Sequence, residues 1–156
     1  MKLKENDPAP AFKLPDQHSK MRSSSEWAGR WTLVYFYPKD DTPGCTKEAC
    51  LLQSRLQDYG RVGLDVVGIS ADNVESHRKF AGKYRLTFPL LSDVDKEVVQ
   101  SYGVWGPKKF MGKEYMGLMR TTFIIGKDGR LKHVMDRVNT KTHHADVCDW
   151  IQKHLK

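Results

Sequence analysis

The sequence lacks any apolar run of the roughly 18–20 residues that a membrane-spanning helix needs. Its first ten residues, MKLKENDPAP, also lack the apolar core of a secretory signal, so we expect a cytoplasmic protein with no membrane partner. Cysteine is scarce, with three in 156 residues, and a chain of this length can bury a core without cross-links. Cytoplasmic thiols stay reduced, so closely spaced cysteines are expected to be reactive or metal-binding, and a structural disulfide is disfavoured.

Features of nucleic-acid-binding proteins are also missing, although the net charge is +7. The basic residues are scattered and acidic residues interrupt them, as in RLKHVMDR, and no zinc-finger spacing or RNA-binding aromatic signature is present. We therefore interpret the charge as a solvated cationic surface and expect no nucleic-acid partner. Because no internal repeat, low-complexity tract or linker is found, the sequence predicts one domain over residues 1–156.

The hydrophobic pattern predicts strands alternating with helices. Continuous β-branched and aromatic runs at residues 31–38 and 64–71 are typical of strands buried on both faces. The main helices are expected at residues 43–59, 74–84 and 142–155. A hairpin is predicted around Asp128 and Gly129. This order predicts an α/β protein with a mixed central sheet flanked by helices, and it suits the thioredoxin fold with a few insertions.

Two of the three cysteines stand five residues apart in KDDTPGCTKEAC, residues 39–50. Thr42 suits the N-cap of the expected 43–59 helix and Pro43 suits its first position. Cys45 then lies in the first helical turn, where unpaired backbone N–H groups and the helix dipole favour a negative charge. Since the thiolate is the reactive form of cysteine, this position predicts a reactive thiol.

A fixed cation is also required near Cys45, because Asp40 and Asp41 oppose its ionisation. The best candidate is Arg120, which MRTTFII places at the start of an expected central strand.

The spacing of Cys45 and Cys50 is incompatible with a disulfide in an intact helix. Five residues give a rise of about 7.5 Å and a rotation of about 140°, so the Cα atoms lie roughly 8.6 Å apart. A disulfide tolerates no more than about 7 Å. If the two cysteines pair, the first turns of the helix must unwind, which favours a switch over a structural cross-link. A zinc site is disfavoured too, because C-x4-C is wider than the usual spacing and no second pair exists.

The stretch YPKDDTPGCTKEAC resembles the active-site segment of peroxiredoxins, in particular the bacterioferritin-comigratory protein or peroxiredoxin Q group. The family's P-x-x-x-T-x-x-C motif matches Pro38, Thr42 and Cys45, and C-T-x-E-x-C matches the segment from Cys45 to Cys50. DPAPAFKLPDQ, VVGISAD, FPLLSD, YGVWG and RTTFIIGKDG extend the resemblance over most of the chain.

The resemblance implies a thiol-dependent peroxidase that uses no metal, haem or flavin. In the family a proline, a threonine, the cysteine and a distant arginine surround the peroxide, and these carry over to Pro38, Thr42, Cys45 and Arg120. Cys45 would attack hydrogen peroxide or an organic hydroperoxide and become a sulfenic acid. Cys50 would resolve it as an intramolecular disulfide, which thioredoxin or a similar dithiol would reduce. The resembling group also implies a monomer.

The third cysteine, Cys148, shares a helix face with His144, Ile151 and Leu155, and we expect it to be a small buried side chain and the fallback resolving thiol. His143 and His144 are interpreted as solvated residues at a helix start.

Two other functions stay open from the sequence. One is a thiol–disulfide oxidoreductase of the thioredoxin fold, which C-x4-C in place of C-x-x-C disfavours. The other is a non-enzymatic, basic redox-sensing or nucleic-acid-binding module.

Overall fold

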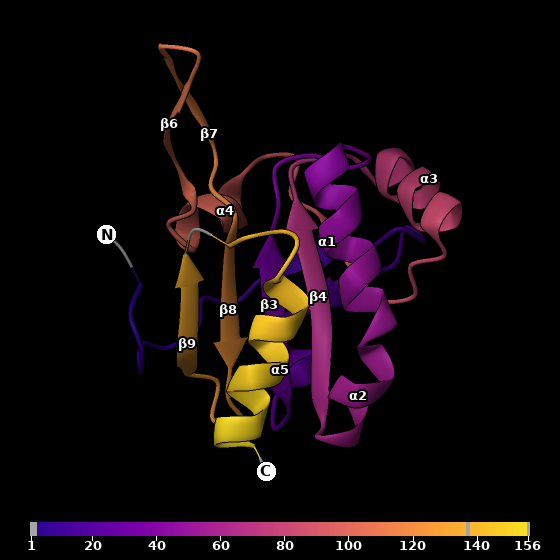
Figure 1. Cartoon of the computed structure of the whole chain (residues 1–156), viewed down its shortest axis with the longest axis vertical. Helices are drawn as coiled ribbons and strands as arrows, with labels where there is room; N and C mark the ends of the chain where they lie inside the picture. Colours follow the sequence, from indigo (N-terminus) through magenta and orange to yellow (C-terminus); the bar gives the residue numbers. More distant parts are fainter. Residues whose placement is uncertain (1–2, 137, 156) are drawn as a thin grey trace.

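A mixed five-stranded sheet forms the centre of the computed structural model, which describes residues 3–136 and 138–155 (Figure 1). Its strands lie in the order β5 (Leu90–Ser92), β4 (Leu64–Ser70), β3 (Trp31–Phe36), β8 (Thr121–Ile125) and β9 (Leu131–Asp136). β3, β4 and β5 are parallel, whereas β8 runs antiparallel to β3 and to β9. The mixed sheet predicted from the sequence is confirmed, including the β8–β9 hairpin.

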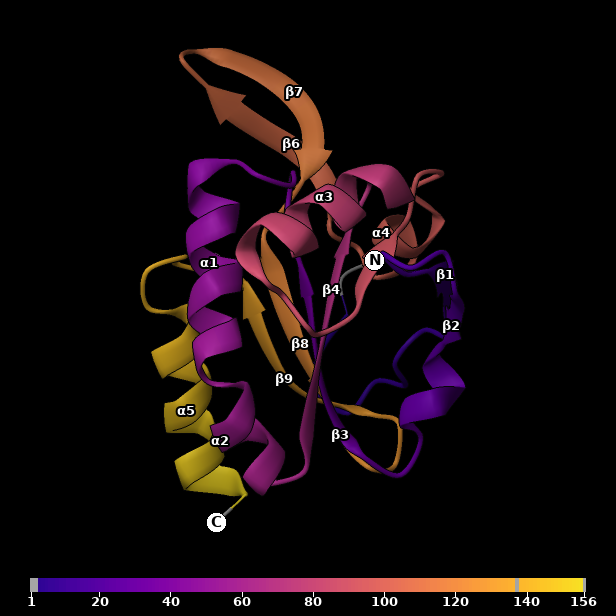
Figure 2. The same cartoon turned by 90° about the vertical axis from the view of Figure 1, so that its right-hand side faces the viewer.

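Helices cover the sheet on both sides. They are α1 (Pro43–Ser54), α2 (Leu56–Arg61), α3 (Val74–Tyr84), α4 (Glu97–Ser101), α5 (His143–His154) and the short 3-10 helix η1 (Ser24–Trp27). Figure 2 shows α1, α2 and α5 on one face, with α4 and the small β1 (Lys13–Pro15)–β2 (Met21–Ser23) pair on the other. Among the described residues, none of these helices is long and apolar enough to cross a bilayer.

Strand β3 is buried on both faces, as its continuous apolar run predicts. Leu33 and Tyr35 belong to one hydrophobic cluster together with residues of α1 and α5. Val34 and Phe36 point the other way, into a cluster that includes Tyr102. The sheet therefore divides two cores, and the strand that leads into α1 is held by both.

The helix expected over residues 43–59 is divided in two at Arg55. The hydroxyl of Ser54 donates a hydrogen bond of 2.6 Å to the carbonyl oxygen of Leu51, which the Arg55 N–H would use in a continuous helix. That N–H instead reaches the Leu52 carbonyl at 3.0 Å. The chain bends there, and Tyr59 is buried from α2 instead of from α1.

A second hairpin, β6 (Trp105–Phe110) with β7 (Lys113–Leu118), was not predicted. It projects beyond the end of the central sheet in both views (Figures 1 and 2). It returns the chain to the sheet at Arg120, immediately before β8.

Candidate active site

The first turn of α1 carries Cys45, as the sequence predicts. Thr42 is the N-cap residue, with φ −93° and ψ 155°, and Pro43 occupies the first helical position. Cys45 is the third residue of the helix and only 2% exposed. The Thr42 side chain does not cap the helix, however, because its hydroxyl donates to the carbonyl oxygen of Lys39 at 2.9 Å. Its hydrogen is thereby committed, and its oxygen can still accept a hydrogen bond.

Arg120 provides the cation that is expected near Cys45. Its Nη2 lies 3.2 Å from Cys45 Sγ and its Nη1 lies 2.6 Å from Glu48 Oε1. Burial alone would lower the pKa of Arg120, but the charges of Glu48 and Cys45 outweigh it and the pKa is raised. The guanidinium is therefore a permanent cation that bridges the thiol and the carboxylate.

Glu48 stands one helical turn after Cys45 and is fully buried. Its second oxygen, Oε2, lies 3.0 Å from Nδ1 of His143, the first residue of α5. The other ring nitrogen of His143, Nε2, lies 2.8 Å from the hydroxyl oxygen of Thr122 on β8. His143 is 1% exposed, so the expectation of a solvated helix-start residue is wrong. The helix start is covered because α5 packs on α1.

Tyr35 adds a buried phenol to the same region. Its ring lies 6.0 Å from that of His143, and its hydroxyl has no hydrogen-bond partner among the described residues. Burial, together with the charges of Glu48 and Cys45, raises its pKa well above the ordinary value. Tyr35 is therefore neutral and contributes no charge to the site.

The two aspartates that precede the helix do not oppose the thiolate as strongly as the sequence suggests. The carboxylate of Asp40 is buried and accepts hydrogen bonds from Tyr37 at 2.6 Å and Ser76 at 2.8 Å. The pKa of Asp41 is lowered by hydrogen bonds from Tyr84 and Lys83, on α3. Both negative charges are thus paired with other groups.

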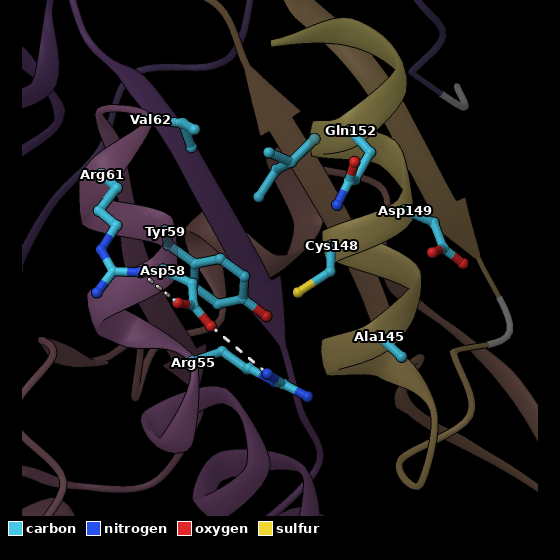
Figure 3. Close-up of a pocket in the computed structure, with 10 residues that line it drawn as sticks. Arg55, Asp58, Tyr59, Arg61, Val62, Ala145, Cys148, Asp149 and Gln152 are labelled. Atoms are coloured by element: carbon cyan, nitrogen blue, oxygen red, sulfur yellow. Dashed lines mark hydrogen bonds and ion pairs between the residues drawn. The ribbon is translucent and has the colours of Figure 1, made fainter. Parts of the chain in front are cut away.

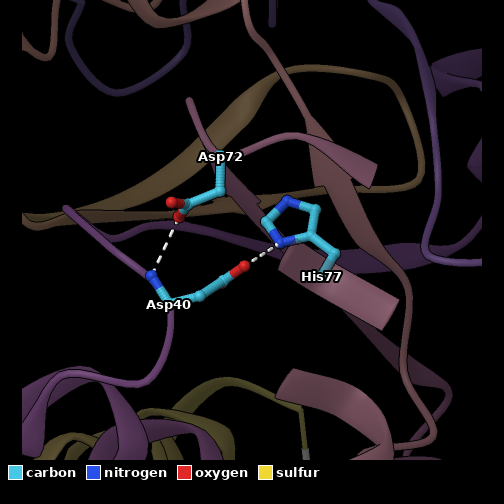
Figure 4. Close-up of side chains that lie close together, drawn as sticks. All are labelled: Asp40, Asp72 and His77. Atoms are coloured by element: carbon cyan, nitrogen blue, oxygen red, sulfur yellow. Dashed lines mark hydrogen bonds and ion pairs between the residues drawn. The ribbon is translucent and has the colours of Figure 1, made fainter. Parts of the chain in front are cut away.

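A buried hydrogen-bond network holds the segment between β3 and α1 (Figure 4). Asp40 Oδ2 lies 2.6 Å from Nδ1 of His77, whose Nε2 lies 3.0 Å from the carbonyl oxygen of Leu91. The Asp40 N–H donates to Asp72 Oδ2 at 2.8 Å, and Ser70 donates to the same oxygen at 2.7 Å. Asp40, Asp72 and His77 have ligand atoms within 4.8 Å of one another, as in a metal site. Because protein groups already occupy these atoms, the arrangement favours an anchor for the segment that carries Thr42.

Pro38 and Gly44 belong to the segment that leads from β3 into α1. Pro38 is half-buried and follows the end of β3 by two residues. Gly44 lies against Arg120: a side chain there would start 3.6 Å from the guanidinium and 3.6 Å from Thr140. The backbone of the first turn therefore comes close to the cation that contacts the thiol.

The chain is similar in sequence and in fold to known proteins of one family. Residues 6–134 match the AhpC/TSA family. The chain is 46% identical to peroxiredoxin Bcp of Escherichia coli K12 over 152 residues, 97% of each chain. It is 32% identical to peroxiredoxin Q of Xanthomonas campestris, with a TM-score of 0.87. That match covers 93% of this chain and 92% of the peroxiredoxin Q chain. The chain belongs to the Bcp/PrxQ peroxiredoxins. This peroxiredoxin also superposes on a mutant of Xylella fastidiosa PrxQ with a TM-score of 0.94 and 28% sequence identity. The match covers 100% of this chain and 99% of the PrxQ chain.

The peroxiredoxin has the thioredoxin-like fold that its element order predicts. As a Bcp-type peroxiredoxin it is a thiol peroxidase that reduces peroxides. The family resemblance stated from the sequence is therefore confirmed.

The other two thiols of this peroxiredoxin lie in different places. Cys50 is half-buried on the intact α1 helix, and burial raises the pKa of its thiol. Cys148 lines a hollow of about 540 Å³ between α2 and α5, beside Arg55 and Tyr59 (Figure 3). Cys50 cannot reach Cys45 while α1 is intact, because five residues of helix separate their Cα atoms by roughly 8.6 Å.

Sequence reasoning missed part of this site. Glu48 was matched to the family pattern without a role, and His143, Thr122 and Tyr35 were not connected with Cys45. A Glu three residues after a reactive cysteine lies on the same side of the helix, and it could have indicated a further cation or hydrogen-bond donor beside it. The position of His143 depends on how α5 packs on α1, which no local pattern specifies.

Proposed function

We propose that Cys45 is the thiol that attacks the peroxide, with Arg120 as the residue that keeps it ionised. The observation that carries this assignment is the contact of 3.2 Å between Arg120 Nη2 and Cys45 Sγ in the first turn of α1. A guanidinium and a helix N-terminus both favour the thiolate, which is the nucleophile. Cys50 and Cys148 have no comparable cation contact among the described residues.

The reaction follows from these positions. The Cys45 thiolate attacks one peroxide oxygen, the S–O bond forms as the O–O bond breaks, and the departing oxygen takes a proton to leave as water or an alcohol. Thr42, whose hydroxyl hydrogen is committed to Lys39, accepts the hydrogen of the peroxide and holds it in line. Arg120 and the Cys45 N–H stabilise the charge on the departing oxygen. Pro38 shields the resulting sulfenic acid from water and from a second peroxide.

Cys50 resolves the sulfenic acid in this proposal. Its thiol attacks the Cys45 sulfur, a disulfide forms and water leaves. The two cysteines are in one continuous helix in the reduced structure, and an ideal helix separates their Cα atoms by roughly 8.6 Å. Because a disulfide needs less than about 7 Å, α1 must unwind near Cys50.

The substrates are hydrogen peroxide and organic hydroperoxides. The bacterioferritin comigratory protein of Xanthomonas campestris, solved as a trapped intermediate and ligand complex, has alkyl peroxide reduction activity, and this chain is 31% identical to it. Thioredoxin or a similar dithiol reduces the Cys45–Cys50 bond, and no metal or organic cofactor takes part. The protein works as a monomer.

Steady-state peroxide consumption tests the proposal. With thioredoxin, thioredoxin reductase and NADPH, the wild-type protein should consume hydrogen peroxide, and Cys45→Ser should not. Cys148→Ser is the matched control, since its thiol lies beside the other end of α1, and it should keep nearly full activity. If Cys45→Ser retained even a tenth of the wild-type rate, Cys45 would not be the reacting thiol. Disulfide reduction without peroxide consumption would instead support a thiol–disulfide oxidoreductase.

A further inference from the structure

The carboxylate of Glu48 is completely buried, and its two oxygens have different partners. Oε1 receives the hydrogen bond from Arg120, whereas Oε2 faces only the imidazole of His143 among the described residues, at 3.0 Å from Nδ1. This contact has the distance of an ion pair but not the angle of a good hydrogen bond. The short distance favours a donor at Nδ1, because a buried carboxylate oxygen without a donor is costly.

The proton positions on His143 follow from its two partners. A carboxylate oxygen can only accept, so Nδ1 must carry a hydrogen to bind Glu48 favourably. The hydroxyl of Thr122, which is also fully buried, can donate to Nε2 and thereby keep the neutral ring in the Nδ1–H form. Glu48 thus selects the Nδ1–H tautomer, and the Thr122 hydroxyl supports it by donating to Nε2.

Charge makes this contact relevant to the reactive thiol. When Cys45 is ionised, the buried group contains two anions, Cys45 and Glu48, and one cation, Arg120. Tyr35 stays neutral. If Glu48 lost its donor at Oε2, its charge would draw Arg120 more strongly and leave less of the guanidinium for Cys45.

Other titratable groups face His143 from neighbouring elements. Asp136 on β9 and Asp146 and Asp149 on α5 line a hollow of about 560 Å³ that His143 also lines. The Asp146 carboxylate accepts from the Thr142 hydroxyl at 3.1 Å.

We propose that His143 is a positioning residue for the peroxidase reaction: its Nδ1–H holds Glu48, Glu48 holds Arg120, and Arg120 holds the Cys45 thiolate. The proposal rests on the assignment of Cys45 as the reacting thiol. It makes α5, whose first residue closes this chain of contacts, a part of the site that ionises the thiol.

The ionisation of Cys45 tests this role without any peroxide. The experiment uses the Cys50→Ser/Cys148→Ser protein, in which Cys45 is the remaining thiol, and follows its alkylation by iodoacetamide against pH with mass spectrometry. His143→Leu should move the midpoint of alkylation upward by about one pH unit, a tenfold change in proton affinity. His143→Asn keeps an amide donor near the place of Nδ1 and should restore a midpoint close to that of the parent protein.

The neighbouring His144→Leu is the matched control, because no hydrogen bond or ion pair joins its side chain to Glu48 among the described residues, and its midpoint should not move. The peroxide rate, measured with all three cysteines present, should fall about tenfold in His143→Leu and within threefold in His143→Asn. An unchanged midpoint in His143→Leu would overturn the proposal. So would an equal shift in His143→Asn, which would mean that packing of the ring, not its donor, matters.

Thr122→Val keeps the test decisive if His143→Leu does not fold. This nearly isosteric change removes the hydroxyl that supports the Nδ1–H tautomer by donating to Nε2, so the midpoint should move in the same direction by a smaller amount. No shift would contradict the tautomer argument. If the alkylation midpoints of the His143 variants moved as expected but the wild-type protein consumed no peroxide, the proposed function would be refuted. The role of His143 in the ionisation of Cys45 would stand.

Discussion

Arg120 is the residue on which the charge of the site depends, since it contacts both the thiol and the buried carboxylate. Arg120→Met should lower the second-order rate of Cys45 oxidation by about 10²–10³, the usual cost of losing one charge-stabilising donor. The apparent pKa of the thiol should rise at the same time. Competition with a haem peroxidase for hydrogen peroxide, repeated over a range of pH, measures both effects.

Two further arginine variants make this result specific. Arg120→Lys keeps the charge but cannot present two N–H groups to Cys45 and Glu48 together, so its rate should fall between those of wild type and Arg120→Met. Arg61→Met removes an exposed arginine at the end of α2 and should change nothing. Wild-type rates and an unshifted pH profile in Arg120→Met would exclude the proposed role.

At the residue scale the sequence predicted the thiol and its cation but not their support. Cys45 and Arg120 could be found because a helix start and a strand start are visible in local patterns. The contact between Glu48 and His143 joins residues 95 positions apart and depends on the docking of two helices. Local periodicity carries no information on such a contact.

Helix α1 holds Cys45 in the reduced protein, and in the proposed mechanism it unwinds after oxidation. Glu48 and Ala49, near its middle, are both fully buried, so this unwinding would withdraw them from the core. We propose that oxidation favours this step, because a sulfenic acid at Cys45 interacts less strongly with the Arg120 guanidinium than a thiolate does. The C-terminal half stays attached through Leu52, which is fully buried.

Hydrogen exchange measures this unwinding. Amides from about Thr46 to Leu51 should exchange faster in the oxidised protein than in the reduced one, whereas α3 should be unchanged and serves as an internal reference. Cys50→Ser treated with the same peroxide cannot form the disulfide and should keep slow exchange in this segment. Equal protection of the segment in both redox states would rule out local unwinding of α1.

The anchor before α1 gives a prediction on stability. His77→Leu removes the imidazole that pairs with Asp40 and leaves that buried carboxylate with fewer donors. The free energy of unfolding should fall by about 1–3 kcal/mol, the usual cost when a buried polar group loses a hydrogen-bond partner. Urea unfolding followed by circular dichroism measures the change.

A variant on the same helix controls for effects on α3 itself. Glu75→Ala removes an exposed acid that pairs with Arg78 and Lys79, and such pairs contribute little. If His77→Leu were no less stable than Glu75→Ala, Asp40 and His77 would not anchor this segment.

At the scale of the whole molecule, the buried strands and the β8–β9 hairpin were predictable because their patterns are strong. The β6–β7 hairpin was missed: its strands contain Gly106, Pro107 and Gly117, which weaken a strand pattern. The bend at Arg55 was missed for a different reason, because it depends on one side-chain hydrogen bond from Ser54.

The disulfide formed by one equivalent of hydrogen peroxide shows which thiol resolves Cys45. After free thiols are blocked with N-ethylmaleimide, trypsin cleaves behind Lys39, Lys47 and Arg55, between and around the two cysteines of α1. We predict that residues 40–47 will be found joined to residues 48–55, the Cys45–Cys50 bond. Residues 40–47 joined to residues 142–153, which contain Cys148, would mean that Cys148 and not Cys50 resolves the sulfenic acid.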